Sequence, residues 1–224
     1  WLAQQFRDNG QSIKDLQRLI VTSSVYRQGS KHDTKNHLID NSNQYLWRMN
    51  RRRLSAEEIR DSILSATGLL NDTQGGPGFY LFKLEHPEHS PHYEYHKYDP
   101  TNPLSYRRAV YRFVVRSQPD PFMTILDCAD SSQSTPVRDE TITSVQALAF
   151  LNNKFNLAMA ERFSESLQDE AADITSQVRT AFSRMTGRLP TSQEQAEFEQ
   201  YARKHDLKNF CRILFNLNEF IYLD

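Results

Sequence analysis

Four short polar segments, each followed by apolar residues at helical spacing, constrain the fold of this chain more than any other feature. They begin at Ser12, Ser55, Thr143 and Thr191, and each has an acidic or amide residue three positions later: Asp15, Glu58, Gln146 and Glu194. This is the capping-box pattern, in which the first side chain accepts a backbone N–H from the fourth residue and the fourth side chain reaches back. We therefore predict helices that begin at these positions, and a mainly α fold.

Apolar residues recur every three or four positions after each cap, which is the spacing of a helix that buries one face. From this spacing we predict helices over 12–27 and 55–70, from 143 to about 168, from 173 to a stop at Gly187, from 191 and from about 206. A short helix ends at Gly10. We expect these helices to form a bundle-like domain.

Two stretches depart from the helical pattern. Residues 71–103 contain the sequence GGPG and four further prolines, so we predict a long irregular loop that serves as a lid, a docking loop or an insertion. Residues 106–116 are rich in aromatic and branched side chains, which favours a strand, and a short extended segment is expected after Pro121. The predicted β element therefore lies around 106–127.

The length and composition of the chain limit its organisation. Its 224 residues are enough for one large domain or two small ones. We predict a single domain over 1–224, with a possible subdivision into 1–70, 71–140 and 141–224. Hydrophobic residues make up only 38% of the chain, which is low for a freestanding globule. Part of the chain is therefore expected to pack against a neighbouring domain or protein.

The charge balance provides no general attraction to polyanions. Lys and Arg number 27 and Asp and Glu number 28, so the net charge is -1. Neither nucleic acid nor an anionic membrane is favoured as a partner by such a chain. No apolar run approaches the roughly 20 residues that span a bilayer, so we predict no membrane span in this chain.

Five segments, in this order, resemble one protein family. They are LQRLIVTSSVYRQ (16–28), RMNRRRLSAEEIRDSIL (48–64), YRRAVYRFVVRS (106–117), TITSVQALAFLNN (141–153) and NLNEFIYLD (216–224). The family is the planctomycete-type domain of unknown function found at the C-terminus of large exported proteins that also carry a cytochrome-c-like region. The resemblance spans nearly the whole chain. This chain departs from the family pattern at Ile142, where the family tends to have Asn, and at Ser144, where the family tends to have Pro.

The resemblance implies a context rather than a reaction. Members are usually exported, so a periplasmic or extracellular location is expected, and the C-x-x-C-H motif that attaches haem c lies upstream of this region. This chain has no such motif, so we expect no cofactor in it. The expected partner is the upstream haem-bearing region of the same protein. The chain is accordingly interpreted as the C-terminal region of a longer protein.

Four histidines lie close together in the irregular loop, at His86, His89, His92 and His96. Imidazole and carboxylate groups are ordinary ligands of zinc, copper and nickel, and a flexible loop could fold several of them around one ion. The prolines between them prevent a shared helix face, and their spacing matches no known metal motif. A metal site and a solvated histidine-rich loop are therefore both open alternatives.

The densest basic patch consists of Arg51, Arg52 and Arg53. With Arg48 beside them, these guanidinium groups could bind phosphate, sulfate or carboxylate, so an anionic polysaccharide or a nucleic acid is a candidate ligand of the patch itself. The alternative is structural: Glu57 and Glu58 follow within helical reach, and arginines that precede such a helix commonly pair with its acidic residues.

The acidic segment 127–140 holds the catalytic candidates Asp127, Asp130 and Arg138. Paired carboxylates can act as acid and base, as they do in glycosidases, when their separation is suitable. The alternative is that these side chains cap helices or form ion pairs.

Other polar side chains are interpreted structurally. The expected caps are Ser12 with Asp15, Ser55 with Glu58, and Thr143 with Gln146. Asn152 and Asn153, inside an apolar helical pattern, are expected to hold neighbouring loops through hydrogen bonds to backbone groups. Cys128 and Cys211 are either inert thiols or a disulfide pair.

Together these features favour a non-catalytic scaffold or interaction module over an enzyme. The rival is a hydrolase or redox-assisted enzyme that acts on polysaccharide, with a site built from the 127–140 carboxylates and the 71–103 loop. A deep pocket that gathers Asp127, Asp130 and Arg138 with histidines would favour the enzyme. Their dispersal into caps and salt bridges would favour the scaffold.

Overall fold

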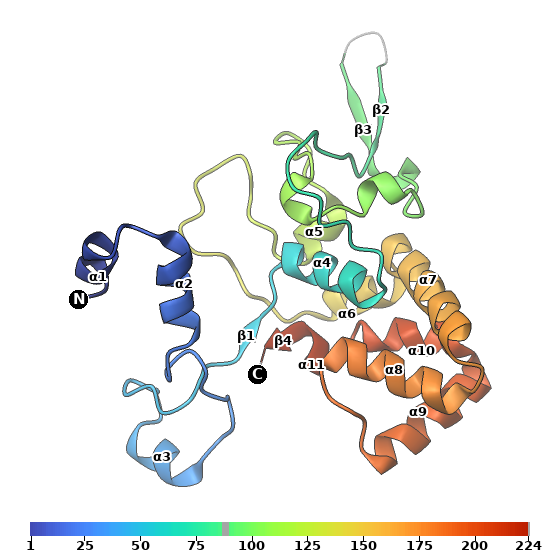
Figure 1. The fold of residues 1–224 in the computed structure, drawn as a ribbon. Helices are drawn as coiled ribbons and strands as arrows, with labels where there is room; N and C mark the ends of the chain where they lie inside the picture. The colour runs from blue at the N-terminus through green and yellow to red at the C-terminus, as the bar shows by residue number, and fades with distance from the viewer. Residues whose placement is uncertain (87–89, 224) are drawn as a thin grey trace. The chain divides into compact units, whose positions relative to one another are not determined.

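The computed structural model describes residues 1–86 and 90–223 and divides the chain into two compact units. The N-terminal unit comprises Trp1–Arg52 together with the end of the chain from Tyr222. The helical unit comprises Arg53–Ile221. Figure 1 shows the helices and strands of both units along the chain.

The N-terminal unit holds three short helices that bury none of their residues. They are α1 (Leu2–Asp8), α2 (Ile13–Val21) and α3 (Thr34–Ile39). Ser12 caps α2, because its side chain accepts the backbone N–H of Asp15 at 3.3 Å. The helix ends at Val21, well before residue 27, where its predicted end lies.

A polar loop, rather than an apolar core, orders the rest of this unit. Asp40 and Asn43 are the only buried residues in the described part of the N-terminal unit. The Asp40 carboxylate accepts the backbone N–H groups of Gln44 at 3.0 Å and Tyr45 at 2.8 Å. The Trp47 indole N–H donates to the Asp40 carbonyl oxygen at 2.8 Å. Local hydrogen bonds therefore hold this loop together.

The helical unit contains the apolar core. Its helices are α4 (Ala56–Ala66), α5 (Pro121–Ile125), α6 (Ser144–Asn152), α7 (Lys154–Glu170), α8 (Ile174–Thr186), α9 (Ser192–His205), α10 (Leu207–Leu214) and α11 (Asn218–Ile221). α10 packs against α7, α8 and α9, and α7 also packs against α4 and α6 (Figure 1). The Phe198 ring lies between those of Phe182 and Phe210, at centroid distances of 5.4 and 5.3 Å. These contacts join α8, α9 and α10 through aromatic surface.

Two adjacent asparagines divide what the apolar spacing predicts as one helix from 143 to about 168. α6 ends at Asn152, and Asn153 has an extended backbone and begins α7. The Asn153 side chain accepts the N–H of Phe155 at 2.9 Å, as an N-cap does. The Asn152 side chain accepts an N–H from Arg212 of α10 at 3.0 Å. The predicted continuous helix is therefore wrong, because this pair of amides makes a joint.

The small β element is a hairpin within the 71–103 stretch, not a structure around 106–127. β2 (Lys83–Glu85) and β3 (His92–Glu94) pair in antiparallel register (Figure 1). A second two-stranded sheet joins β1 (Arg52–Arg53) to β4 (Tyr222–Leu223).

The predicted strand over 106–116 is wrong. Ala109–Tyr111 form a single 3-10 turn, η3, and isolated bridges on either side of it take the place of a ladder. The Arg107 guanidinium donates to the backbone carbonyls of Thr73 and Gly75, so a side chain holds the 71–79 segment here. A pattern of aromatic and branched residues cannot reveal such a side-chain contact.

The segment that begins at Pro121 is helical rather than extended. Asp120 is the N-cap of α5, and its carboxylate accepts the N–H groups of Phe122 at 2.9 Å and Met123 at 3.3 Å. Pro121 occupies the first helical position, where a missing N–H costs nothing. The sequence Asp-Pro therefore starts a helix here.

The predicted class, mainly α with a small β element, is confirmed by the described residues. Within them, no helix is both long enough and apolar enough to cross a membrane. Cys128 and Cys211 are free thiols, so the alternative of a disulfide between them is wrong. Burial raises the pKa of both thiols, which makes them poor nucleophiles.

Candidate functional site

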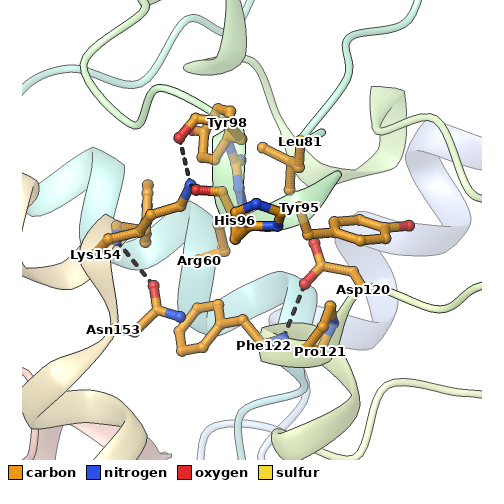
Figure 2. A pocket seen from close by; sticks show the side chains of 11 residues that line it. Arg60, Leu81, Tyr95, His96, Tyr98, Asp120, Pro121, Phe122, Asn153 and Lys154 are labelled. Carbon is orange, nitrogen blue, oxygen red and sulfur yellow. Dashed lines mark hydrogen bonds between the residues drawn. The ribbon is translucent and has the colours of Figure 1, made fainter. Parts of the chain in front are cut away.

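A cavity of about 290 Å³ lies in the helical unit, beside α5, the start of α7 and the segment that follows β3 (Figure 2). The residues that line it are Arg60, Leu81, Tyr95, His96, Tyr98, Asp120, Pro121, Phe122, Asn153, Lys154 and Phe155. Its walls are mostly apolar and aromatic. Arg60, Asp120 and Lys154 bring a guanidinium, a carboxyl and an amino group to this apolar space.

Arg60 reaches the cavity from α4 and is almost completely buried, with 1% of its surface exposed. Its Nη1 donates to the carbonyl of Arg107 at 2.9 Å, and its Nη2 donates to the carbonyl of Ser105. The guanidinium lies over the rings of Phe79 and Phe155, at 4.9 and 5.3 Å from their centroids. Its Nε is buried without a hydrogen-bond partner among the described residues. The group is thus held firmly by its two Nη atoms and the flanking rings.

Lys154 is the first residue of α7 and follows the asparagine joint. Its Nζ donates to the carbonyl of His96 at 3.0 Å and to the carbonyl of Tyr98, and it lies 5.0 Å from the Tyr98 ring centroid (Figure 2). Burial lowers the pKa of Lys154. The side chain therefore holds the segment after β3 at the edge of the cavity.

Asp120 contributes the carboxyl group of the cavity. One of its oxygens, Oδ1, accepts both N–H groups at the start of α5. Burial raises the pKa of Asp120, although Arg112 and Arg60 partly oppose this effect. Burial, with a contribution from Asp120, also raises the pKa of Tyr95 to about 12. The cavity thus disfavours negative charge on its own side chains.

Among the predicted catalytic residues, Asp127 is a structural link. Its carboxylate accepts from the Arg53 guanidinium at 2.8 Å, from the Thr141 backbone N–H at 2.8 Å and from the Gln146 amide at 3.0 Å. Although burial opposes ionisation, the hydrogen bonds from Thr141, Arg53 and Gln146 lower the pKa of Asp127. Donors from the chain itself therefore occupy this carboxylate.

Asp130 and Arg138 make contacts of their own. Arg138 binds the Glu57 carboxylate through two hydrogen bonds of 2.6 and 3.2 Å. Asp130 accepts the backbone N–H of Ser132 at 2.8 Å, and it lines an open hollow of about 420 Å³ that lies beside α5. The three predicted catalytic residues are thus divided among a structural link, an ion pair and a turn.

The basic patch of Arg51, Arg52 and Arg53 is not a single surface. Arg53 is buried, and besides Asp127 it donates to the carbonyl of Thr141 at 2.7 Å. Arg51 and Arg52 are exposed and belong to the N-terminal unit. The buried arginine is therefore a structural residue.

The predicted metal ligands lie on and beside the hairpin. His86 and His92 are exposed. Nδ1 of His92 is 3.9 Å and Nδ1 of His96 is 3.1 Å from the Glu94 carboxylate. His89 lies outside the described residues. In residues 1–86 and 90–223, no group of three His, Cys, Asp or Glu side chains could hold a metal ion.

The polar residues assigned to helix starts cap their helices, although Ser12 with Asp15 makes only the first of the two capping-box hydrogen bonds. Ser55 with Glu58 and Thr143 with Gln146 each form both hydrogen bonds of a capping box. Gln146 has a second role, because its side-chain amide also donates to Asp127. The start of α6 and the end of the acidic segment are therefore held by the same side chain.

The N-terminal unit exposes an apolar surface on α1 and α2. This α1–α2 apolar surface consists of Trp1, Leu2, Ile13, Leu19 and Ile20, all of which are exposed. On α2 the apolar side chains follow helical spacing, so they form one stripe along the helix. None of the residues of these two helices is buried.

Sequence reasoning missed the charged residues of the cavity. Arg60 could have been found, because it shares the helical face of Ala56 and Ile63 and is therefore directed toward the core. Asp120 had a weaker signature, the Asp-Pro pair of a helix start. Lys154 had no sequence signature, since its environment depends on residues 96–98, which are distant in sequence.

Comparisons with known proteins identify a family but no characterised relative. A family model described as PSD1, protein of unknown function (DUF1553), matches residues 1–202. No curated protein and no solved structure matches the chain significantly.

Proposed function

This chain belongs to the PSD1 family of proteins of unknown function (DUF1553), and we propose that it serves there as a non-catalytic interaction module. It docks through the α1–α2 apolar surface onto the haem-bearing region of the same exported protein. Planctomycete-type, exported and cytochrome-associated context enters this proposal from the resemblance of the five sequence segments.

One observation carries the proposal: α1, α2 and α3 bury none of their residues, yet they bear large exposed apolar side chains. Isolated helices of this length are marginal in water, and most helices gain their stability by burying an apolar face. A surface that covers α1 and α2 would supply that burial. A concentration of exposed apolar side chains is what a protein-interaction site would require.

The contacts of the acidic segment also support a structural role. Asp127 is bound by Arg53 and Arg138 binds Glu57, so these groups act within the fold. The rival function, a polysaccharide-active or redox-assisted enzyme built on residues 127–140, requires them to meet a substrate together. Their contacts lend that alternative no support.

The proposal is tested by calorimetric titration of residues 1–224 with the haem-bearing region expressed from the same gene. Ile13 and Ile20 are exposed by 64% and 39%, and the double variant Ile13→Ser/Ile20→Ser should weaken binding at least tenfold. Burial of one such side chain is worth about 1.5–3 kcal/mol. Ser and Ile have similar helix propensities, so α2 itself should persist.

A matched control places a comparable pair of aliphatic-to-serine changes on the helical unit. Val110 and Val137 are exposed by 73% and 81%, and Val110→Ser/Val137→Ser should leave the affinity unchanged. The docking proposal fails if the wild-type chain shows no binding at about 100 µM. It fails equally if hydrogen exchange finds α2 strongly protected in the free monomer, because its apolar surface is then already covered by the chain itself.

A further inference from the structure

We propose that the cavity beside α5 and the start of α7 is a binding site for a small organic carboxylate with an aromatic or aliphatic body. The site lies wholly within the helical unit and does not depend on the docking function proposed above. Its ligand would place the apolar body against the aromatic walls and the carboxylate among the cationic side chains.

The apolar walls of the cavity indicate the size and chemistry of the ligand's apolar part. Leu81, Pro121, Phe122 and Phe155 provide apolar surface, and Tyr95 adds an aromatic ring whose hydroxyl is already donated to the carbonyl of Gln118 at 2.8 Å. The volume of about 290 Å³ is close to the lower end of the range for small-molecule pockets. A molecule with one ring or a short branched chain therefore fits better than a large cofactor.

The charged side chains of the lining indicate which polar group the ligand carries. Arg60 and Lys154 are cationic, whereas Asp120 is the only carboxyl group that the described residues bring to the lining. The Arg60 Nε is buried and lacks an acceptor within the described chain. In this apolar space Arg60 and Lys154 would attract an incoming carboxylate, because charge-assisted interactions are strong where water is excluded.

The surroundings of Arg60 hold its guanidinium in a fixed position beside the cavity. Asp61 is the nearest carboxylate, 3.6 Å from Arg60 Nη1, but it does not line the cavity and it accepts the Ala109 N–H at 2.7 Å. Both Nη atoms of Arg60 donate to backbone carbonyls, and two phenylalanine rings flank the group. The guanidinium is thus preorganised, which lowers the cost of binding.

Other ligand classes match the cavity less well. Phosphate has no apolar body to contact the walls. It also carries up to two negative charges, whereas Arg60, Lys154 and Asp120 together give the lining a net charge of about one positive. A sugar presents hydroxyl groups on most of its surface, and apolar walls would leave many of them without partners. A monocarboxylate needs polar partners at one end only.

The first test is a set of probes titrated into the full chain and followed by NMR chemical shifts. Benzoate should bind saturably, and benzamide, its uncharged counterpart of the same shape, should bind at least tenfold more weakly. Inorganic phosphate and methyl glucoside should not saturate the site. Equal affinities for benzoate and benzamide, or saturation by methyl glucoside in place of benzoate, would overturn the proposal.

The second test uses two substitutions with opposite expected signs. Lys154→Met keeps the apolar stem but removes the charge, so it should weaken benzoate binding at least tenfold. Asp120→Asn keeps an N-cap for α5, because Asn is as good a cap as Asp, and should tighten benzoate binding at least threefold. A partly exposed lysine outside the cavity lining provides the control: Lys208, which pairs with Glu161 at 2.9 Å, should tolerate Lys208→Met with no change in affinity.

These outcomes decide the proposal even if one variant is unstable. Should Lys154→Met fail to fold, the tightening caused by Asp120→Asn still separates an anionic ligand from a neutral one. No tightening in a folded Asp120→Asn protein would refute the inferred anion site. Failure of the docking experiment would leave this result untouched, since the two tests probe different units.

Discussion

At the scale of single residues, one carboxylate decides how the acidic segment is used. Asp127 receives donors from Arg53, Thr141 and Gln146, and it has a left-handed backbone with φ of 62°. Asp tolerates this conformation better than most residues. The same side chain therefore fixes a turn and joins three segments that are far apart in sequence.

Removal of this carboxylate should destabilise the helical unit strongly. Asp127→Ala removes a carboxylate that forms an ion pair with the buried Arg53, and breaking a buried pair costs about 3 kcal/mol or more. Urea unfolding followed by circular dichroism measures the loss. Asp130→Ala is the matched control: Asp130 is exposed and makes a local contact with Ser132, so its change should stay within about 0.5 kcal/mol.

The pH dependence of this loss follows from the lowered pKa of Asp127. A carboxyl group with a depressed folded pKa stabilises the fold above its unfolded value, near 3.8, and the contribution is lost as pH falls through the folded pKa. The stability difference between wild type and Asp127→Asn should be constant from about pH 5 to 7 and shrink below about pH 4. A difference that grows on acidification would contradict this assignment.

At the scale of elements, side-chain pattern predicts where helices begin better than where they stop. Thr143 and Thr191 start α6 and α9 with complete capping boxes, because this interaction is local in sequence. The break at Asn153 was missed, since the apolar spacing continues across it. The strand expected over 106–116 was wrong because contacts with the distant 71–79 segment determine that backbone.

The cavity was beyond sequence reasoning for a related reason. Its charged residues come from α4, from the cap of α5 and from the start of α7, and no local pattern links these positions. The acidic segment was predicted as the site instead, because its charged residues lie close together in the chain. For the cavity and for the acidic segment alike, proximity in sequence did not predict proximity in the fold.

The close approach of the 71–79 segment to η3 leads to a prediction for Gly78. A Cβ atom at this position would lie 2.9 Å from the carbonyl oxygen of Tyr111, which is backbone and cannot move aside easily. Gly78→Ala should therefore cost about 1–3 kcal/mol in urea unfolding. Thr73→Ala, an exposed change in the same segment, should cost no more than about 0.5 kcal/mol. Equal effects would mean that this approach is not tight in solution.

At the scale of the whole molecule, burial is divided unequally between the two units. Every buried apolar side chain among the described residues lies between Leu54 and Ile221, within the helical unit. The buried side chains of the N-terminal unit are polar, at Asp40 and Asn43. Stability should therefore reside in one unit and recruitment of a partner in the other.

This division predicts that the helical unit survives on its own. A chain shortened to residues 53–224 should unfold cooperatively with a Tm within about 2 °C of the full chain, because it keeps all of the apolar core. It should also keep its affinity for benzoate while losing affinity for the haem-bearing region. A Tm lower by more than about 5 °C would show that the N-terminal unit adds substantially to the stability of the core.

The indole of Trp47, held by the Asp40 carbonyl, has a practical consequence for optical work. Trp1 and Trp47 are the only tryptophans in the sequence, and both belong to the N-terminal unit. Indole emission therefore reports on that unit alone. The tyrosines of the cavity, Tyr95 and Tyr98, contribute instead to near-ultraviolet circular dichroism from the helical unit. Docking through the N-terminal unit can thus be followed by indole emission in an unlabelled sample.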